Sequence, residues 1–145
     1  MAEIKEEIIG GKKRHFTVGA IIEKGGKDDA LLMIDRKKLP FGWACPAGHI
    51  DKGETSKEAL KREVKEETGL DIIKYKLVAE EFLPWNECSY RIKGHYWYVY
   101  TCTVKGSLKI CAEEAKSWGW VDKTNLRNLA LEPVWEHWFN KLGII

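Results

Sequence analysis

The chain has 145 residues, of which 44% are hydrophobic and 32% are charged, and its formal net charge at pH 7 is +2. This length predicts one domain over residues 1–145, with enough chain to bury a core. The near-neutral charge disfavours a nucleic-acid-binding protein, which normally carries a strong basic field. The N-terminal segment has no long apolar run, so we expect no signal peptide, no membrane anchor and a cytoplasmic location.

Strands are predicted over residues 15–23 and 30–36, because both segments are rich in apolar and β-branched side chains. The sequence GGKDD between them is typical of a turn, so the two strands should form a hairpin. The sequence KKLPFG then breaks the pattern, and WACPAG is predicted to be a short strand.

A helix is predicted over residues 55–68. Thr55 and Glu58 have the spacing of a capping box, in which each side chain accepts a hydrogen bond from the other residue's backbone. Gly69 stands where a helix C-terminus favours a left-handed residue. The helix therefore has a start signal and a stop signal of its own.

Three further strands are predicted, over residues 77–83, 95–105 and 118–121, and the last is short. A helical stretch over residues 124–142 should be interrupted near Pro133, which cannot continue a helix. The order of strands, helix, strands and helix indicates a mixed α/β or α+β fold in which helices sandwich the sheet.

Aromatic side chains are concentrated late in the chain. In the strand 95–105 three tyrosines alternate with Trp97 and Val99, so at least one face of this strand must be core. Trp135 and Trp138 have the i, i+3 spacing of one helix face. Core packing is the favoured interpretation for these aromatics, although stacking on a nucleobase is the alternative for those outside the core.

The four cysteines form no C-x-x-C pair, which argues against a zinc knuckle and against a thioredoxin-type motif. In a reducing compartment they are expected to be small core or surface residues. They are Cys45, Cys88, Cys102 and Cys111.

The predicted helix 55–68 carries an unusual acidic face. At about 100° per residue, the side chains of Glu63, Glu66 and Glu67 fall within a sector of roughly 100°. An apolar seam formed by Leu60 and Val64 lies beside that sector, whereas the lysines lie far round the helix.

Two interpretations of this face are open. A run of like charges is usually a solvated surface. However, Glu63 and Glu67 are a repulsive i, i+4 pair, and only Glu66 has a cationic neighbour at i−4, which is Arg62. Carboxylates clustered beside a core seam are also the oxygen ligands that Mg²⁺ prefers, so the alternative is a divalent cation site.

The spacing around this helix closely resembles a known motif. Gly48, five residues, Glu54, seven residues and then REVKEETGL over residues 62–70 are similar to the Nudix box, G-x5-E-x7-R-E-U-x-E-E-x-G-U. Val64 and Leu70 stand at the positions of the aliphatic residue U. Nine matches at defined spacing make the motif highly specific. The resemblance implies an α/β/α sandwich around a mixed sheet and covers nearly the whole chain.

The resemblance also implies an activity and the residues that perform it. Nudix hydrolases cleave a nucleoside diphosphate linked to another group X with Mg²⁺ or Mn²⁺. Glu66 and Glu67 would be metal ligands, and Glu63 a ligand or the base that activates water. Arg62 would hold the catalytic glutamate by a salt bridge.

Other positions of the motif are expected to shape the site. Gly48, Glu54 and Gly69 would support the loop and helix, and Glu54 is also a candidate ligand of a second metal. Ala47 replaces a glycine in the W-x-x-P-G-G sequence that often precedes the box, and its carbonyl is a candidate metal ligand. Outside the box, Glu113 and Glu114 are candidates for a further metal ligand or base, with ordinary loop carboxylates as the alternative.

The identity of X is open. Arg36 and Trp85 are weak candidates for contacts to phosphate and base, respectively. Pro84, fourteen residues after Leu70, resembles a feature of the ADP-ribose-cleaving branch of the family, and this resemblance slightly favours ADP-ribose or another nucleotide sugar. His49 and His95 have no assigned role; a histidine in the box loop could approach a phosphate, but a surface position is the favoured interpretation.

The partner is therefore expected to be a small nucleotide, with no nucleic acid and no membrane. A homodimer is an open alternative, as it is for many soluble proteins. A second class of function is a nucleotide-sensing module that binds without turnover. Such a module would be expected to lack some carboxylates of the box, and here all are present.

Overall fold

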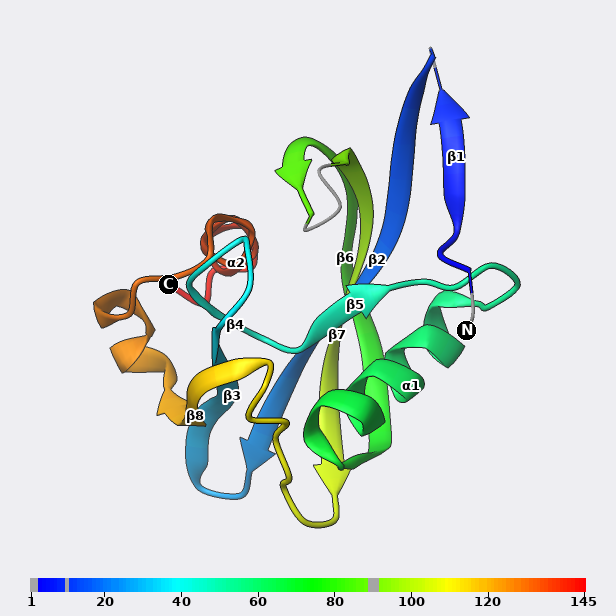
Figure 1. The fold of residues 1–145 in the computed structure, drawn as a ribbon. Coiled ribbons are helices and arrows are strands. Elements are labelled where there is room, and N and C mark those ends of the chain that lie inside the picture. Colours follow the sequence, from blue (N-terminus) through cyan, green and yellow to red (C-terminus); the bar gives the residue numbers. More distant parts are fainter. Residues whose placement is uncertain (1–2, 10, 89–91) are drawn as a thin grey trace.

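A mixed β-sheet runs through the centre of the computed structural model, which describes residues 3–9, 11–88 and 92–145 (Figure 1). Two α-helices and one 3-10 helix accompany the strands. In chain order the elements are β1 (Glu6–Ile9), β2 (Lys12–Gly25), β3 (Asp28–Arg36), β4 (Trp43–Ala44), β5 (Ala47–His49), α1 (Ser56–Thr68), β6 (Asp71–Glu87), β7 (Lys93–Lys105), β8 (Ala115–Asp122), η1 (Lys123–Asn128) and α2 (Pro133–Lys141).

The long strand β2 organises the sheet. It pairs in parallel with β7, from His15 opposite His95 to Ile22 opposite Cys102. Its antiparallel neighbours are β3, β1 and β5. The sheet extends on one side through β3 to β4 and β8, and on the other through β7 to β6. One parallel pair among antiparallel pairs makes this the mixed sheet that the sequence predicts.

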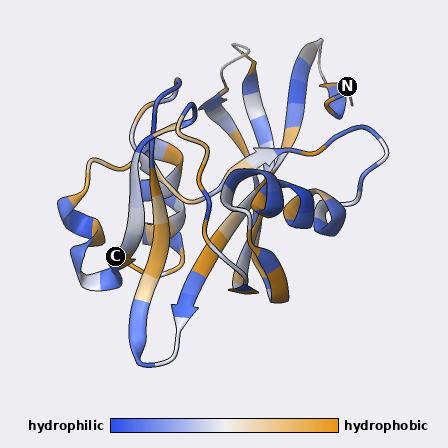
Figure 2. Ribbon diagram, turned by 60° about the horizontal axis from the view of Figure 1, so that its bottom comes forward, coloured by the Kyte–Doolittle hydropathy of each residue, from blue (hydrophilic) through white to orange (hydrophobic). Residues whose placement is uncertain are grey.

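The two helices cover opposite faces of the central strands (Figure 1). Leu60 and Val64 of α1 pack against Ile22, Tyr100 and neighbouring side chains on one face. Figure 2 shows that α1 is otherwise largely hydrophilic, as expected of a helix that buries one stripe.

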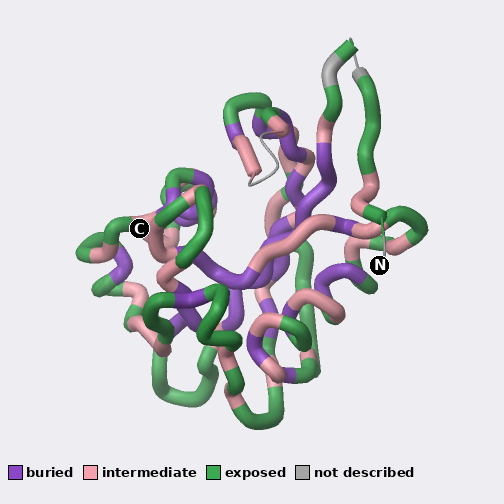
Figure 3. The backbone as a smooth tube through the Cα atoms, viewed as in Figure 1, coloured by how far each residue is buried: buried purple, intermediate pink, exposed green. Residues whose placement is uncertain are grey.

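On the other face, α2 buries its aromatic residues. Trp135 and Trp138 are fully buried and contact Trp97, which comes from β7. Val99 of the same strand belongs to this cluster, whereas Tyr100 belongs to the cluster under α1. Both faces of β7 are therefore core over this stretch, and the buried segments in Figure 3 follow the central strands. The core assignment of the two helix tryptophans is confirmed.

The structure also corrects element bounds. The predicted strand 77–83 is part of the longer β6, and β1 was not predicted. The predicted helical stretch 124–142 is divided into η1 and α2, with Pro133 as the first residue of α2, where its missing N–H costs no hydrogen bond. Within the described residues, no helix has the length and apolar character needed to cross a membrane.

Candidate active site

Local sequence signals place α1 after β5. Thr55 Oγ1 accepts a hydrogen bond from Glu58 N at 3.1 Å, and Glu58 Oε1 accepts one from Thr55 N at 3.0 Å, so the capping box is formed. At the other end, Gly69 has a left-handed φ of 74°, and its N–H donates to the carbonyl of Lys65. The acidic face is thus held at a defined position next to β5.

Arg62 joins the loop before the helix to the acidic face. Its guanidinium donates to both carboxylate oxygens of Glu54, at 2.8 and 2.9 Å, and to the carbonyl of His49 at 3.0 Å. It also donates to Glu63 Oε1 at 2.8 Å and to Glu66 Oε2 at 3.1 Å. Arg62 thus pairs with the adjacent Glu63 as well as with Glu66, one turn further along the helix. These donations raise the pKa of Arg62, with Glu54 as the largest cause, so its charge is secure.

Glu54 supports the junction between loop and helix. Besides Arg62, it accepts a hydrogen bond from Asp51 N at 2.8 Å. The hydrogen bonds from Arg62 lower the pKa of Glu54 and favour its charged form. Asp51 lies 3.3 Å from the guanidinium and adds a further carboxylate, which no sequence pattern singled out.

Glu63 packs directly on the backbone of Gly48. A Cβ atom at position 48 would overlap the Glu63 carboxylate group, so only glycine fits there. The Glu63 side chain is 15% exposed, and burial raises its pKa to about 7 even though Arg62 opposes this shift. Burial is thus the stronger influence on this carboxylate.

Glu67 lies at the centre of the site. It lines a hollow, and Ala47 N donates a hydrogen bond to its Oε2 at 3.2 Å. Burial and the neighbouring Glu63 raise the pKa of Glu67 well above its usual range. The same hollow is lined by Arg36 and Glu114 and by other residues of the β3–β5 region and the loop before β8: Ile34, Lys38, Ala44, Cys45, Pro46, Ala47 and Ile110.

The structure brings most of the predicted site residues together. Arg36 stands opposite Glu67 in the hollow, where it also donates to the Pro40 carbonyl at 2.8 Å. Glu114 lines the hollow and lies 3.1 Å from Lys38 Nζ. Glu66 is connected to the site by its ion pair with Arg62, but its side chain is 58% exposed.

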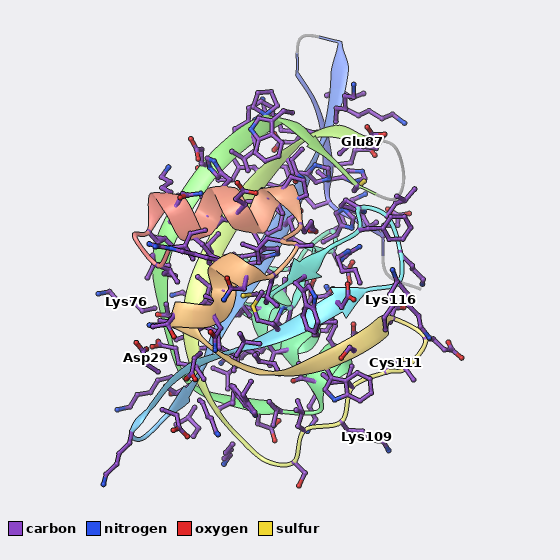
Figure 4. All side chains as sticks on the ribbon, turned by 90° about the vertical axis from the view of Figure 1, so that its left-hand side faces the viewer. Asp29, Lys76, Glu87, Lys109, Cys111 and Lys116 are labelled. Atoms are coloured by element: carbon purple, nitrogen blue, oxygen red, sulfur yellow. The ribbon has the colours of Figure 1, made fainter. Side chains whose placement is uncertain are left out.

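Two predicted residues lie elsewhere. Glu113 is exposed and is absent from the lining of the hollow. Trp85 contacts the ring of His137 and lines a separate shallow hollow along α2, which shares no lining residue with the hollow at Glu67. The structure therefore does not bring Trp85 to the acidic face. Figure 4 shows the loop before β8, marked by Lys109 and Cys111, well away from Glu87 at the end of β6.

Sequence reasoning selected neither Lys38 nor Glu132, two charged residues near Arg36. Lys38 adds a positive charge beside Arg36, and the buried Glu132 has its Oε1 3.8 Å from Arg36 Nε. Basic residues at a turn and a glutamate before a proline carry no distinctive pattern, so no sequence signal singled them out. His95 was expected at the surface, but it is only 2% exposed.

The arrangement fits a hard divalent cation. Glu63 and Glu67 repel one another in a poorly solvated place, and the arginine that contacts Glu63 is already shared with Glu54 and Glu66. Mg²⁺ and Mn²⁺ prefer oxygen ligands, and every candidate donor here is a carboxylate or a backbone carbonyl. A cation at this face would relieve the repulsion that the fold creates.

Comparisons with known proteins agree with this geometry. The chain is similar to an ADP-ribose pyrophosphatase of Methanocaldococcus jannaschii, with 50% identity over 56 residues that cover 37% of this chain and 31% of that protein. It is similar to an RNA pyrophosphohydrolase of Nitratiruptor sp., with 52% identity over 77 residues that cover 51% and 48%, respectively. The matched segments thus span less than half the length of each relative.

The fold has close structural neighbours as well. A MutT protein from Methanosarcina mazei superposes with a TM-score of 0.74 over 91% of this chain and 94% of that chain, at 21% identity. This likeness confirms the mixed α/β sandwich. The NUDIX domain model matches residues 13–141, which include nearly all of β2, the strands from β3 to β8, both helices and the acidic face. The chain therefore belongs to the Nudix family.

Proposed function

We propose that this protein hydrolyses the pyrophosphate linkage of a nucleoside diphosphate joined to a further group X, with Mg²⁺ or Mn²⁺ as cofactor. The observation that carries the proposal is the position of Glu67. Its desolvated carboxylate lies beside Glu63 and in one hollow with Arg36. Negative groups for a cation and a positive group for phosphate therefore meet in one place.

The residues of the acidic face have different proposed roles in binding the cation and in positioning its ligands. Glu63, Glu66 and Glu67 would hold the cation, with the carbonyl of Ala47 as a further candidate. When bound, the cation neutralises phosphate oxygens and lowers the pKa of water. Arg62 keeps Glu63 in place, since it bonds the loop and the helix at once.

The general base is a carboxylate that can accept the proton of the attacking water. Glu63 is a candidate for this base, as the alternative to its role as a ligand, because Arg62 holds its carboxylate in place. Glu114 is a further candidate because it lines the same hollow. Attack of water on one phosphorus breaks the anhydride bond and leaves two phosphate-bearing products.

The substrate side of the hollow is cationic. Arg36 and Lys38 supply positive charge from β3 and the loop after it, and a guanidinium can bind phosphate in a bidentate manner. The names of the two relatives refer to different substrates, ADP-ribose and RNA, so X is best identified by assay. A nucleoside triphosphate or a nucleotide sugar such as ADP-ribose is the proposed substrate class.

The test is product release from a panel of nucleoside triphosphates, oxidised triphosphates, ADP-ribose, nucleotide sugars, NADH and dinucleoside polyphosphates, with Mg²⁺ and with Mn²⁺. Inorganic pyrophosphate with a monophosphate identifies a triphosphate substrate, whereas two organic phosphates identify the other classes. Glu67→Gln should lose most turnover and stay folded. A folded Glu67→Gln protein with a near wild-type rate would overturn the assignment.

Glu114→Gln and Glu113→Gln form a matched pair of control variants. Both remove one charge from the same loop, but only Glu114 lines the hollow. We expect Glu114→Gln to lower kcat and Glu113→Gln to leave it close to wild type. Nucleotide binding without turnover across the whole panel would favour the alternative of a sensing module.

A further inference from the structure

A second group of metal-ligating side chains lies apart from the acidic face of α1. One nitrogen or sulfur atom from each of His15, His49, Cys88 and His95 lies within 4.8 Å of the corresponding atom of every other member. We call these four residues the His–Cys cluster. They come from β2, β5, the residue after β6, and β7. Figure 4 labels Glu87, the last residue of β6, at the end of the sheet where Cys88 follows.

The sheet register brings the histidines together. His15 pairs with His95 across the parallel strands β2 and β7. His49 pairs with Thr17 on the other side of β2, and residues 15 and 17 lie on the same face of that strand. The three imidazole rings are consequently neighbours, with centroids 4.9 to 5.7 Å apart.

The outer ring nitrogens of two histidines already have oxygen partners. His95 Nδ1 lies 2.7 Å from the carbonyl of Asn86, and His15 Nε2 lies 3.0 Å from Glu6 Oε2. An N–H donated to these oxygens leaves the other ring nitrogen as a lone-pair donor. Metal-binding histidines are usually oriented in this way, by a carbonyl or a carboxylate behind the ring.

The inner nitrogen of His95 is the decisive atom. Among the described residues, His95 Nε2 is buried and has no hydrogen-bond partner, and the whole residue is 2% exposed. A buried polar atom without a partner is costly and needs an explanation. On the opposite ring, His15 Nδ1 lies 3.8 Å from Cys88 Sγ. A ligand between these rings would satisfy His95 Nε2.

We propose that the His–Cys cluster binds a zinc ion through three imidazole nitrogens and one thiolate. Zn²⁺ prefers four nitrogen and sulfur ligands in tetrahedral geometry. Its usual bond lengths place ligand atoms roughly 3.3–3.8 Å apart, so atoms now within 4.8 Å need to move by only about 1 Å. Mg²⁺ prefers oxygen ligands and is disfavoured here, in contrast to the acidic face.

The expected role is structural, because four protein ligands leave no position for substrate. The ion would join β2, β5, β7 and Cys88, the residue after β6. His49 would connect the two sites, since its carbonyl accepts a hydrogen bond from Arg62 Nη2 at 3.0 Å while its side chain belongs to the cluster. Zinc would therefore steady the loop that holds Arg62 without entering the reaction.

The test measures metal content and spectra of the full chain, independently of activity. Protein stripped with a chelator is titrated with Zn²⁺, and separately with Co²⁺ as a spectroscopic probe, in excess Mg²⁺. We expect one equivalent of tightly bound Zn²⁺, a higher Tm, and a Co²⁺ complex with tetrahedral absorption bands and a thiolate charge-transfer band. Cys88→Ser should abolish the charge-transfer band and weaken Zn²⁺ binding at least tenfold, and His95→Gln should weaken binding similarly.

Two control variants separate this site from its alternatives. Cys111→Ser removes an exposed cysteine outside the cluster and should bind like wild type. Glu67→Gln alters the acidic face and should also keep its zinc, so failure of the proposed catalytic function leaves this test intact. Circular dichroism confirms that the variants are folded. The proposal is overturned if wild type binds no stoichiometric zinc, or if zinc binding is lost in Glu67→Gln but unchanged in Cys88→Ser and His95→Gln.

Discussion

Gly48 illustrates how one residue can control a site without taking part in its chemistry. Its missing side chain leaves the space that the Glu63 carboxylate occupies. Glu63 is in turn hydrogen-bonded to Arg62, so the position of one glycine affects the whole acidic face. Close packing against a backbone is a common reason for glycine at a functional position.

Gly48→Ala is expected to lower kcat at least tenfold while the protein stays folded. The added methyl group would push the Glu63 carboxylate away from its present position, and misplacement of a reacting group by about 1 Å can cost roughly a hundredfold in rate. Turnover of the identified substrate and circular dichroism measure the two effects. Gly119→Ala is the matched control, because no atom lies within 4 Å of a Cβ there. Equal rates for the two variants would contradict the packing argument.

At the scale of elements, α1 is specified almost entirely by its own sequence. The capping box forms as predicted, and the left-handed Gly69 ends the helix where its backbone can bond back to Lys65. Leu60 and Val64 then orient the helix, because burying them against the sheet leaves the acidic sector beside β5. The capping residues thus determine where α1 begins and ends, and its apolar seam determines how the helix is rotated about its axis.

Thr55→Ala should destabilise the protein by about 1 kcal/mol, since it removes the side-chain acceptor for an N-terminal N–H of α1. Urea unfolding followed by circular dichroism gives this difference, provided that the slope of the transition is unchanged. Thr124→Ala, at an exposed position of η1, serves as the control and should change stability by less than about 0.5 kcal/mol. A loss of stability that is equal in both variants would show that the cap has no specific effect.

At the scale of the whole molecule, the two faces of the sheet differ in what packs against them. The face under α1 supports the acidic cluster, whereas the face under α2 is packed with tryptophans. Glu132 is an exception on the α2 side. It is 5% exposed, its Oε2 has no hydrogen-bond partner among the described residues, and its only nearby opposite charge is Arg36 at 3.8 Å. Burial raises its pKa to about 7.

Glu132 should make stability depend on pH. Between pH 4.5 and about 7 the folded state holds a proton on Glu132 that the unfolded chain has lost, so stability falls as pH rises through this range. The shift corresponds to roughly 3 kcal/mol at most. Glu132→Gln should flatten this part of the curve and be more stable than wild type above pH 7.

Denaturant unfolding from pH 4.5 to 8 measures this effect. Glu136→Gln, which changes an exposed glutamate in the first turn of α2, four residues after Glu132, is the control and should follow the wild-type curve. The wild-type curve also contains other titrating groups, so the difference between the two variants is the informative quantity. If the two curves coincide, burial of Glu132 does not govern the pH dependence.

The sequence by itself determined the family, the order of most strands and of the two α-helices, and the acidic face, because these depend on spacing along the chain. Periodicity, capping residues and the box occupy contiguous positions, so they can be recognised without tertiary contacts. The search for C-x-x-C pairs, in contrast, gave no reason to select Cys88, because this cysteine has no second cysteine near it in the sequence. The expected surface position of His95 was wrong for a similar reason, since its burial depends on neighbours from other strands.

Only the tertiary structure decided which distant residues share a site. The parallel pairing of β2 with β7 places His15 beside His95, although eighty positions separate them in the sequence. The loop before β8 likewise passes close to the hollow at Glu67, so that Glu114, but not Glu113, lines it. Such contacts depend on which strands pair, in which register, and on the path of the loops between them. The secondary-structure propensity of a short segment does not encode this information.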